Sequence, residues 1–492
     1  MSDQLEEALQ AYKDSLPAGR IETLRIDGAD YLGLPIYNVD LFTDQGYYSG
    51  IGYGATKTEA LVGAYGELAE DCHLQLSFPK LPQREATYSE LVEECGEEAV
   101  LDPLTLVLPT NSHYDPDLHL RWVQIERLRD GQSTWCPVEF VASGDNELGS
   151  YPNQLTTAIS NGTGAGETEQ RALLHALLEL LQRDGNADSF RALDRGTVID
   201  PSTVDNRVRE VMDGLADKGL KVILKLARVT CGCASVYAVG EDTTDDQFGL
   251  SATACGEAAD PDIGKALRKA VLECASSHSR KRFNNLPFER VTNQVPEDYF
   301  KRIREAIVLD EEEERALRAM IGFVTSTKSE VRERLADSVF SQKETISAAG
   351  LPAFTEVSIE QRLQYVLDHL EREGMEPYVF RASSPDGKCH AVKIVVPGIE
   401  MEFGSYHRIG YRGVQRLLAD DPFVLLSRVS APGNALIRLT EHQDHDLGGP
   451  FYLNTARLDE IIDPLYGLYR EPTAHAAPIA IQEGYLADTP SA

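Results

Sequence analysis

One sequence pattern occurs twice in this chain and restricts how the chain can fold. Residues 52–71 and residues 164–183 align without a gap, and eight of the twenty aligned positions are identical. Each copy opens with glycines and continues with apolar residues at helical spacing, which predicts a glycine-containing loop that leads into an amphipathic helix. Because loop and helix match in one register, we interpret the two copies as an internal repeat. The alternative is that amphipathic helices resemble one another by chance.

A shorter version of the pattern, ALxxAxxE, occupies residues 266–273. Alanine, leucine and glutamate are common helix formers, so chance explains this third copy as well as a true repeat does. All three copies carry a glutamate at one equivalent position, which is occupied by Glu67, Glu179 and Glu273. If the first two copies are related, their helices face each other and their glutamates converge.

The spacing of polar residues in the first two copies fits a magnesium site. Glu67 and Glu70 are three residues apart, as are Glu179 and Gln182, so each pair lies on one face of its predicted helix. Four oxygen donors from two helices suit Mg²⁺, which prefers oxygen ligands and keeps water or phosphate in its other positions. Arg183 would then contact a phosphate oxygen. Taken singly, each glutamate is equally well explained as a solvated surface residue.

The glycines of residues 162–166 precede the second predicted helix. Backbone amides at a helix N-terminus favour anions, so this loop is a candidate phosphate site, with a simple turn as the alternative. The sequence contains neither a P-loop nor a kinase signature, so the familiar nucleotide-binding folds find no support. It also offers no nucleophilic triad, and the catalytic residues stay unknown.

Composition limits the class of partner. The 492 residues exceed one compact core and predict two or three subdomains. With 47 Lys and Arg against 79 Asp and Glu, the net charge of −32 opposes nucleic acid and membranes as partners, whereas bound Mg²⁺ reconciles a triphosphate with carboxylates. Neither a signal peptide nor a run of ~18 apolar residues is present, so we expect a cytoplasmic protein. The eight scattered cysteines predict free thiols.

Hydrophobic spacing predicts an alternation of helices and strands that is typical of an α/β protein. Thr56 followed by Glu59 predicts a capping box at the start of the first repeated helix. Besides the elements of the repeat, we expect a short acidic helix at the N-terminus, strands at residues 21–28, 34–42, 120–128, 133–142, 220–229, 233–240, 376–383 and 391–400, and helices near residues 88–99 and 358–373.

Four segments resemble the motifs of YcaO-domain proteins and follow the order of that family. Residues 160–184 carry an SNG element, a glycine-containing loop and a helix with an ExxER-like end. Residues 52–71 resemble the earlier helix, residues 256–280 the third motif, and AVKIVVPGIE followed by RIGYR the late strand with its PGLE-like end. The resemblance implies an α/β, YcaO-like fold of multi-subdomain sheets with helices that form a nucleotide site. The expected parts are an N-terminal segment (1–47), a YcaO-like domain (48–412, with a charged helical section at about 288–350) and a C-terminal extension (413–492).

The resemblance also implies an enzyme that uses ATP and Mg²⁺. Members of the family activate a peptide backbone amide by phosphorylating its oxygen, after which a side chain gives an azoline, a sulfide gives a thioamide, or an amine gives an amidine. By this resemblance the metal-binding positions are Glu67, Glu70, Glu179 and Gln182, and the nucleotide-binding positions are Thr56, Glu67, Arg183, Glu273, Ser276 and Arg280.

The chain departs from the family pattern at several of these positions. Gln182 replaces a glutamate, which keeps a carbonyl oxygen but removes a negative charge. Asp71 stands where an arginine is usual, and so places negative charge where a phosphate contact is expected. The other departures are Gly63 for Ser, Tyr53 in a commonly lysine-bearing GKG element, and Ser276 and His278 near the expected Gln and Arg. A non-catalytic, accessory YcaO-like protein of a peptide-modification complex is therefore the alternative function.

The resemblance carries expectations about products and partners. The C-terminal sequence ADTPSA lacks the PxP ending of azoline-forming members, which favours a thioamide, an amidine or an accessory role. No segment resembles a fused E1-like leader-binding domain, so we expect a peptide or protein substrate and a separate E1-like or sulfur-delivery partner. A homodimer is a further option. A ligase that activates a carboxylate and releases AMP is a third functional alternative.

Overall fold

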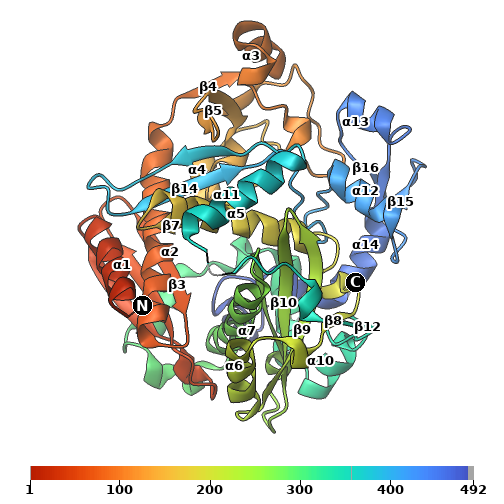
Figure 1. Cartoon of the computed structure of the whole chain (residues 1–492). Helices are drawn as coiled ribbons and strands as arrows, with labels where there is room; N and C mark the ends of the chain where they lie inside the picture. The colour runs from red at the N-terminus through yellow and green to blue at the C-terminus, as the bar shows by residue number, and fades with distance from the viewer. Residues whose placement is uncertain (1, 356, 486–492) are drawn as a thin grey trace.

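The computed structural model describes residues 2–355 and 357–485, and it is a mixed α/β structure as expected (Figure 1). The strands of these residues form four sheets. A three-stranded antiparallel sheet contains β1 (Arg20–Arg25), β2 (Ile36–Phe42) and β3 (Tyr47–Tyr53). A six-stranded sheet has the order β4 (Gln83–Ala86), β5 (Leu120–Arg127), β13 (Tyr378–Arg381), β14 (His390–Val395) and β7 (Thr163–Gly166), with β6 (Ser133–Pro137) paired to β5.

The five-stranded sheet has the order β11 (Thr253–Asp260), β10 (Cys233–Asp242), β9 (Leu220–Thr230), β8 (Thr197–Ile199) and β12 (Glu344–Ile346). Near the C-terminus, β15 (Leu426–Ser427), β17 (Tyr452–Asn454) and β16 (Asn434–Leu436) form a small sheet. The α-helices are α1 (Ser2–Ser15), α2 (Lys57–Ser77), α3 (Tyr88–Cys95), α4 (Asp145–Leu148), α5 (Glu169–Asn186), α6 (Asn206–Ala216), α7 (Ile263–Asn285), α8 (Tyr299–Ala306), α9 (Glu314–Thr325), α10 (Lys328–Leu335), α11 (Ile359–Arg372), α12 (Tyr411–Ala419), α13 (Glu441–Asp446), α14 (Thr455–Ile462), α15 (Tyr466–Tyr469) and α16 (Ala476–Glu483).

The repeated pattern folds three times into the same unit, an edge strand followed by a helix. The units are β3–α2, β7–α5 and β11–α7, and each strand lies at the end of its sheet. Each helix packs on the sheet of its own strand and also on the next sheet: α2 on β7 and β14, α5 on β9, β10 and β11, and α7 on β3. These contacts close a ring of three sheets and three helices (Figure 1).

Several glycines of the pattern lie in strands, and this corrects the prediction of a glycine loop. Gly52 lies in β3, and Gly164 and Gly166 lie in β7, which pairs with β14 at the edge of its sheet, while Gly54 and Gly162 lie just outside these strands. The glycines are required because the helix backbone lies directly on the strand. A Cβ atom on Gly52 would lie 2.1 Å from the carbonyl oxygen of Ala60, and one on Gly164 would lie 2.3 Å from that of Ala172, its repeat equivalent.

The third copy obeys the same packing rule. A Cβ atom on Gly50 would lie 2.2 Å from the carbonyl oxygen of Ala64, and one on Gly256 would lie 2.2 Å from that of Ala270. Ala64 and Ala270 occupy equivalent positions in the ALxxAxxE alignment. The strand–helix contacts therefore align the first and third copies in the same way as the sequence does. The third copy is therefore a structural repeat and not a chance resemblance of helices.

Most other expected elements form, with local differences. Thr56 caps α2 by accepting a hydrogen bond from the Glu59 amide (3.2 Å), but the Glu59 carboxylate accepts from the Ala55 amide, so the expected capping box is only half made. The strand expected at 133–142 ends at Pro137 and continues as a 3₁₀ turn. The charged section at 288–350 is helical in α8, α9 and α10, yet it also contributes β12, which pairs in parallel with β8.

The region expected as a C-terminal extension is folded onto the rest of the chain. Its residues share a core with Phe190, Leu193, Tyr237 and Leu317. The expected boundary at residue 412 falls inside α12, and the division into three parts stays a prediction. The ADTPSA ending lies outside the described residues.

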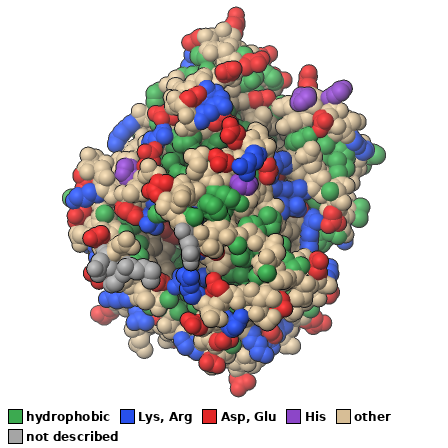
Figure 2. Space-filling view, viewed as in Figure 1, with side chains coloured by type: hydrophobic (Ala, Val, Ile, Leu, Met, Phe, Trp, Pro, Cys, Tyr) green, Lys and Arg blue, Asp and Glu red, His purple; other side chains and the backbone are tan. Residues whose placement is uncertain are grey.

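Three further observations concern the thiols, the hydrophobicity of the helices and the surface charge. The eight cysteines carry free thiols, as predicted. In the described ranges, no helix combines the length and the apolar character that crossing a bilayer requires. Figure 2 shows Lys and Arg side chains interspersed with Asp and Glu over the viewed face.

Candidate active site

The ring of helices brings the predicted glutamates together. Tyr53 on β3 donates a hydrogen bond from its hydroxyl to Glu273 Oε2 on α7 (3.1 Å), which joins the first and third repeat units. Glu179 on α5 raises the pKa of Glu70 on α2. Glu273 raises the pKa of Glu67. Charges on the three helices thus influence one another, and a common metal or nucleotide site at these glutamates stays a prediction.

Burial changes the titration of the two glutamates on α2. It raises the pKa of Glu67 to about 7, although the hydrogen bond that Glu67 accepts from the Ile51 amide (2.9 Å) acts to lower that pKa. It raises the pKa of Glu70 to about 8, against a hydrogen bond from Thr163. The Glu67 side chain is nevertheless exposed to water. A carboxylate that touches water yet is surrounded by protein is poised to exchange its proton for a cation.

Arg183 lies among these carboxylates. Burial lowers the pKa of Arg183, but Glu257 and Glu179 outweigh it and raise that pKa above its ordinary value. Its NH1 lies 3.6 Å from Glu257 Oε2. Asn161, from the SNG element, donates to Glu179 Oε1 (3.3 Å). Arg183 of the second unit thus faces the Glu257 carboxylate of the third unit, and Glu179 is bonded to the SNG segment.

Gln182 is buried and its amide donates to Glu257 Oε2 (3.3 Å), as does that of Asn186 (2.6 Å). A glutamate at position 182 would face the Glu257 carboxylate, which explains why this chain has an amide there. The sequence reasoning missed Glu257. Its position directly after Gly256, the strand glycine of the third unit, is the signal that could have found it.

Asp71 takes little part in the cluster. Its carboxylate accepts a hydrogen bond from Gln75 (2.5 Å), and burial raises its pKa. Gly63 faces β3, since a Cβ atom there would lie 3.3 Å from the Gly52 Cα. These two departures from the family pattern are therefore used for packing within the first unit.

The later part of α7 divides between two faces. Ser276 is buried, and its hydroxyl has no hydrogen-bond partner within the described residues; the same holds for Arg280 Nε. His278 does not reach the cluster. Its Nδ1 lies 2.9 Å from Asp30 Oδ2 and its Nε2 lies 3.4 Å from Asp242 Oδ2, in a buried network that attaches the N-terminal segment to α7.

A buried lysine near the cluster was also missed. Lys393 on β14 is 1% exposed, and its ammonium donates to the carbonyl oxygens of Ile159 and Asn161. Burial lowers the pKa of Lys393 to about 8, against the attraction of Glu179 and Glu70. It therefore fixes the SNG segment that carries Asn161. The alternation of polar and apolar residues in AVKIVV was the available signal.

The residues present fit a hard divalent cation with phosphate. No three His, Cys, Asp or Glu side chains in residues 2–355 and 357–485 are preassembled as a metal site. Mg²⁺ does not need such a cage, because it binds one or two carboxylates and completes its shell with water and phosphate oxygens. Glu67 and Glu70, whose burial disfavours their charge, and the unpartnered Ser276 and Arg280 suit that combination.

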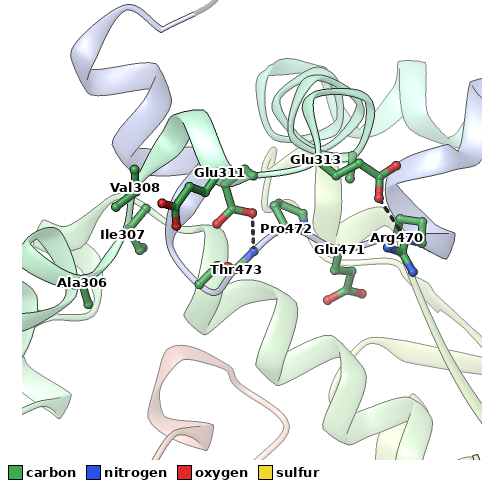
Figure 3. A pocket seen from close by; sticks show the side chains of 11 residues that line it. Ala306, Ile307, Val308, Glu311, Glu313, Arg470, Glu471, Pro472 and Thr473 are labelled. Atoms are coloured by element: carbon green, nitrogen blue, oxygen red, sulfur yellow. Dashed lines mark hydrogen bonds and ion pairs between the residues drawn. The ribbon is translucent and has the colours of Figure 1, made fainter. Parts of the chain in front are cut away.

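A separate cavity of about 450 Å³ lies between the α8–α9 connection and the segment after α15. Two of its carboxylates already have partners within the protein. Glu313 pairs with Arg470 (3.0 Å), as Figure 3 shows. Glu312 accepts a hydrogen bond from the Thr473 amide (3.0 Å). None of the predicted site residues lines it. We assign it no chemistry.

The fold and the converging side chains define an α/β protein with a polar site built from three helices. A family model described as YcaO cyclodehydratase, ATP- and Mg²⁺-binding, matches residues 51–400. The chain belongs to the YcaO family, whose cofactors are ATP and Mg²⁺.

Two relatives are similar in sequence. An uncharacterized protein of Methanothermobacter thermautotrophicus is 28% identical over 416 residues, which cover 82% of this chain and 96% of that protein. An uncharacterized protein in the tfuA 3′ region of Rhizobium leguminosarum bv. trifolii is 24% identical over 383 residues, covering 74% and 80%.

Two solved structures share the fold. A heterocyclase in complex with substrate and cofactor has a TM-score of 0.60 at 17% identity, and the match covers 89% of this chain and 56% of the heterocyclase. This chain thus spans little more than half of that protein. YcaO from Methanopyrus kandleri, bound with AMPPCP and Mg²⁺, has a TM-score of 0.53 at 16% identity, covering 81% and 90%.

Proposed function

We propose that this chain activates a peptide backbone amide by phosphorylating its oxygen with ATP and Mg²⁺, which leads to a thioamide, an amidine or an azoline in a ribosomally made peptide or protein. The supporting observation is that three helices of a YcaO fold carry Glu67, Glu70, Glu179 and Glu273, whose charges influence one another, with Tyr53 of the first unit bonded to Glu273 of the third. Two proteins with this fold are consistent with the proposal, because one is a heterocyclase in complex with substrate and cofactor and the other is a YcaO protein bound with AMPPCP and Mg²⁺.

Each residue would contribute by position and charge. Glu67, Glu70, Glu179 and the amide oxygen of Gln182 would hold the metal. Arg183 and Arg280 would bind phosphate oxygens, with Ser276 as a hydroxyl donor and Thr56 at the start of α2. Magnesium, when bound, neutralises the charge of the phosphoryl group. Asn161 and Lys393 orient the segment beside Glu179. In such a transfer, positioning and electrostatics supply most of the rate.

The direct test is nucleotide binding by the purified protein. AMPPCP with Mg²⁺ should bind the wild type in a calorimetric titration, and Glu179→Gln should weaken binding at least about tenfold, because a charged ligand of the metal is lost. Glu169→Gln, an exposed carboxylate on the same helix, is the matched control and should leave binding unchanged. An intact wild-type protein that binds no nucleotide rejects the proposal.

The product is tested with a candidate peptide, ATP, Mg²⁺ and either sulfide or an amine. Loss of one water indicates an azoline, and exchange of oxygen for sulfur indicates a thioamide. A separate E1-like or sulfur-delivery partner and a homodimer belong to the same proposal. Fractionation that finds the protein outside the cytoplasm would contradict the expected localisation.

The accessory alternative has one specific observation in its favour. Gln182 gives its amide to Glu257, so the second unit has a single carboxylate toward the metal where the family pattern has two. A protein that binds its peptide or partner equally well as wild type and as Glu179→Gln, and does not consume ATP, would belong to this class.

A further inference from the structure

The common register of the three units identifies one more helix position at the cluster. One turn before the equivalent glutamates lie Gly63 on α2, His175 on α5 and Lys269 on α7. The register is fixed by the strand glycines that lie under each helix. Because residues four apart share a helix face, Lys269 lies on the face of Glu273. The same face continues to Ser276 and Arg280.

The contacts around α7 place this face toward the first unit. Glu273 accepts from Tyr53 on β3 (3.1 Å), and Arg268 NH2 lies 3.5 Å from Glu59 Oε2 on α2. Lys269 is exposed and makes no ion pair with the described residues, in contrast to its neighbour Arg268. Its ammonium is therefore free to meet a ligand.

Lys269 acts on groups from all three helices. Burial raises the pKa of Glu67 on α2 and of Glu273 on α7, and the positive charge of Lys269 opposes that rise in both. Although the His175 side chain touches water, the surrounding protein, then Lys269 and Arg171, lower its pKa to about 3. His175 is thus neutral at physiological pH, and Gly63 has no side chain. Of the three equivalent positions, only that of Lys269 carries a positive charge.

We propose that Lys269 binds the β- or γ-phosphate of the nucleotide. It supplies a positive charge that the first unit lacks, because that unit has Asp71 where an arginine is usual. This inference rests on the proposed function, because it assigns a residue to the same nucleotide site. Asp71 is bonded to Gln75 and offers a phosphate no cation. An ammonium on the helix face of Glu273, which is directed toward the unit that carries Glu67 and Glu70, suits the phosphate oxygens of a bound nucleotide.

The test compares AMPPCP and AMP in calorimetric titrations with Mg²⁺. Lys269→Gln should weaken AMPPCP binding about tenfold or more, since a charge-assisted hydrogen bond is lost, and should leave AMP binding within about twofold. Lys269→Arg should restore most of the AMPPCP affinity. Lys265→Gln is the matched control, since Lys265 is an exposed lysine one turn earlier on α7, and it should bind like the wild type.

Two results would overturn the inference while the proposed function stands: Lys269→Gln binding AMPPCP as tightly as the wild type, or losing AMP and AMPPCP affinity equally. A folded wild-type protein that binds neither nucleotide overturns the proposed function itself. Lys269 is exposed, so all variants should unfold at the temperature of the wild type.

Discussion

The amide side chain of Gln182 is explained by the residue that it contacts in space, not by its position on its own helix. In sequence it looks like a weakened metal ligand. In the structure its amide meets the carboxylate of Glu257, which also accepts from Asn186 and lies near Arg183. A carboxylate on strand β11 therefore lies next to the amide at position 182 on helix α5.

Glu67 and Glu70 make the stability of the metal-free protein depend on pH. Both carboxyls have a pKa raised by burial, to about 7 and about 8, from an unfolded value of 4.5. The folded state thus binds their protons more tightly than the unfolded state, and stability falls as the pH rises through this range. Without Mg²⁺, the unfolding temperature should be lower at pH 8 than at pH 6, and Glu70→Gln should reduce the difference. An equal difference in both proteins would contradict this assignment.

Magnesium should oppose this dependence on pH. Because Mg²⁺ competes with protons for the same carboxylates, it should raise the unfolding temperature more at pH 8 than at pH 6. The effect should be smaller in Glu70→Gln.

The repeated element is a strand and helix in direct backbone contact. Gly256→Ala would place a Cβ atom 2.2 Å from the Ala270 carbonyl oxygen, so helix α7 would have to shift. We expect a loss of about 3 kcal/mol in the free energy of unfolding, measured with denaturant. Gly214→Ala, in the exposed helix α6 with no atom within 4 Å, is the control and should gain about 0.5–1 kcal/mol. Equal effects would show that α7 does not lie directly on β11.

On the scale of the whole molecule, the C-terminal part is tied to the site through helix α5. Asp184, next to Arg183, is buried and accepts from Arg412 NH1 (2.7 Å) and Arg416 NH2 (2.6 Å) of α12. Glu400 accepts from the amides of Gly410 (2.9 Å) and Gly413 (2.6 Å) at the start of α12. Residues beyond the family match thus hold the helix that carries Glu179.

Asp184→Ala should be strongly destabilising, because it leaves two guanidinium groups without their buried partner. We expect a loss of about 3–5 kcal/mol in the free energy of unfolding. The exposed pair of Arg457 and Glu460 (2.9 Å) provides the control, and Arg457→Ala should cost less than about 1 kcal/mol. Similar losses in both variants would mean that the contact between α12 and α5 adds no stability.

The sequence by itself determined the first two repeated helices, the positions of their glutamates and the α/β class, and its motifs resemble those of the family. The helices and their glutamates follow from local spacing, which survives in any fold that keeps one helix face toward the site. The third copy became a certain repeat only through its packing on β11. Only the tertiary structure decided that the glycines lie in edge strands, that Asp71 turns to Gln75, and that Gln182 meets Glu257. From the sequence alone, a glycine before a helix predicts a turn, because the helix that packs over it is not yet known. The direction of a polar side chain depends on partners far away in the chain. For the same reason, Lys269 stood out only after the packing of the three units had fixed their common register.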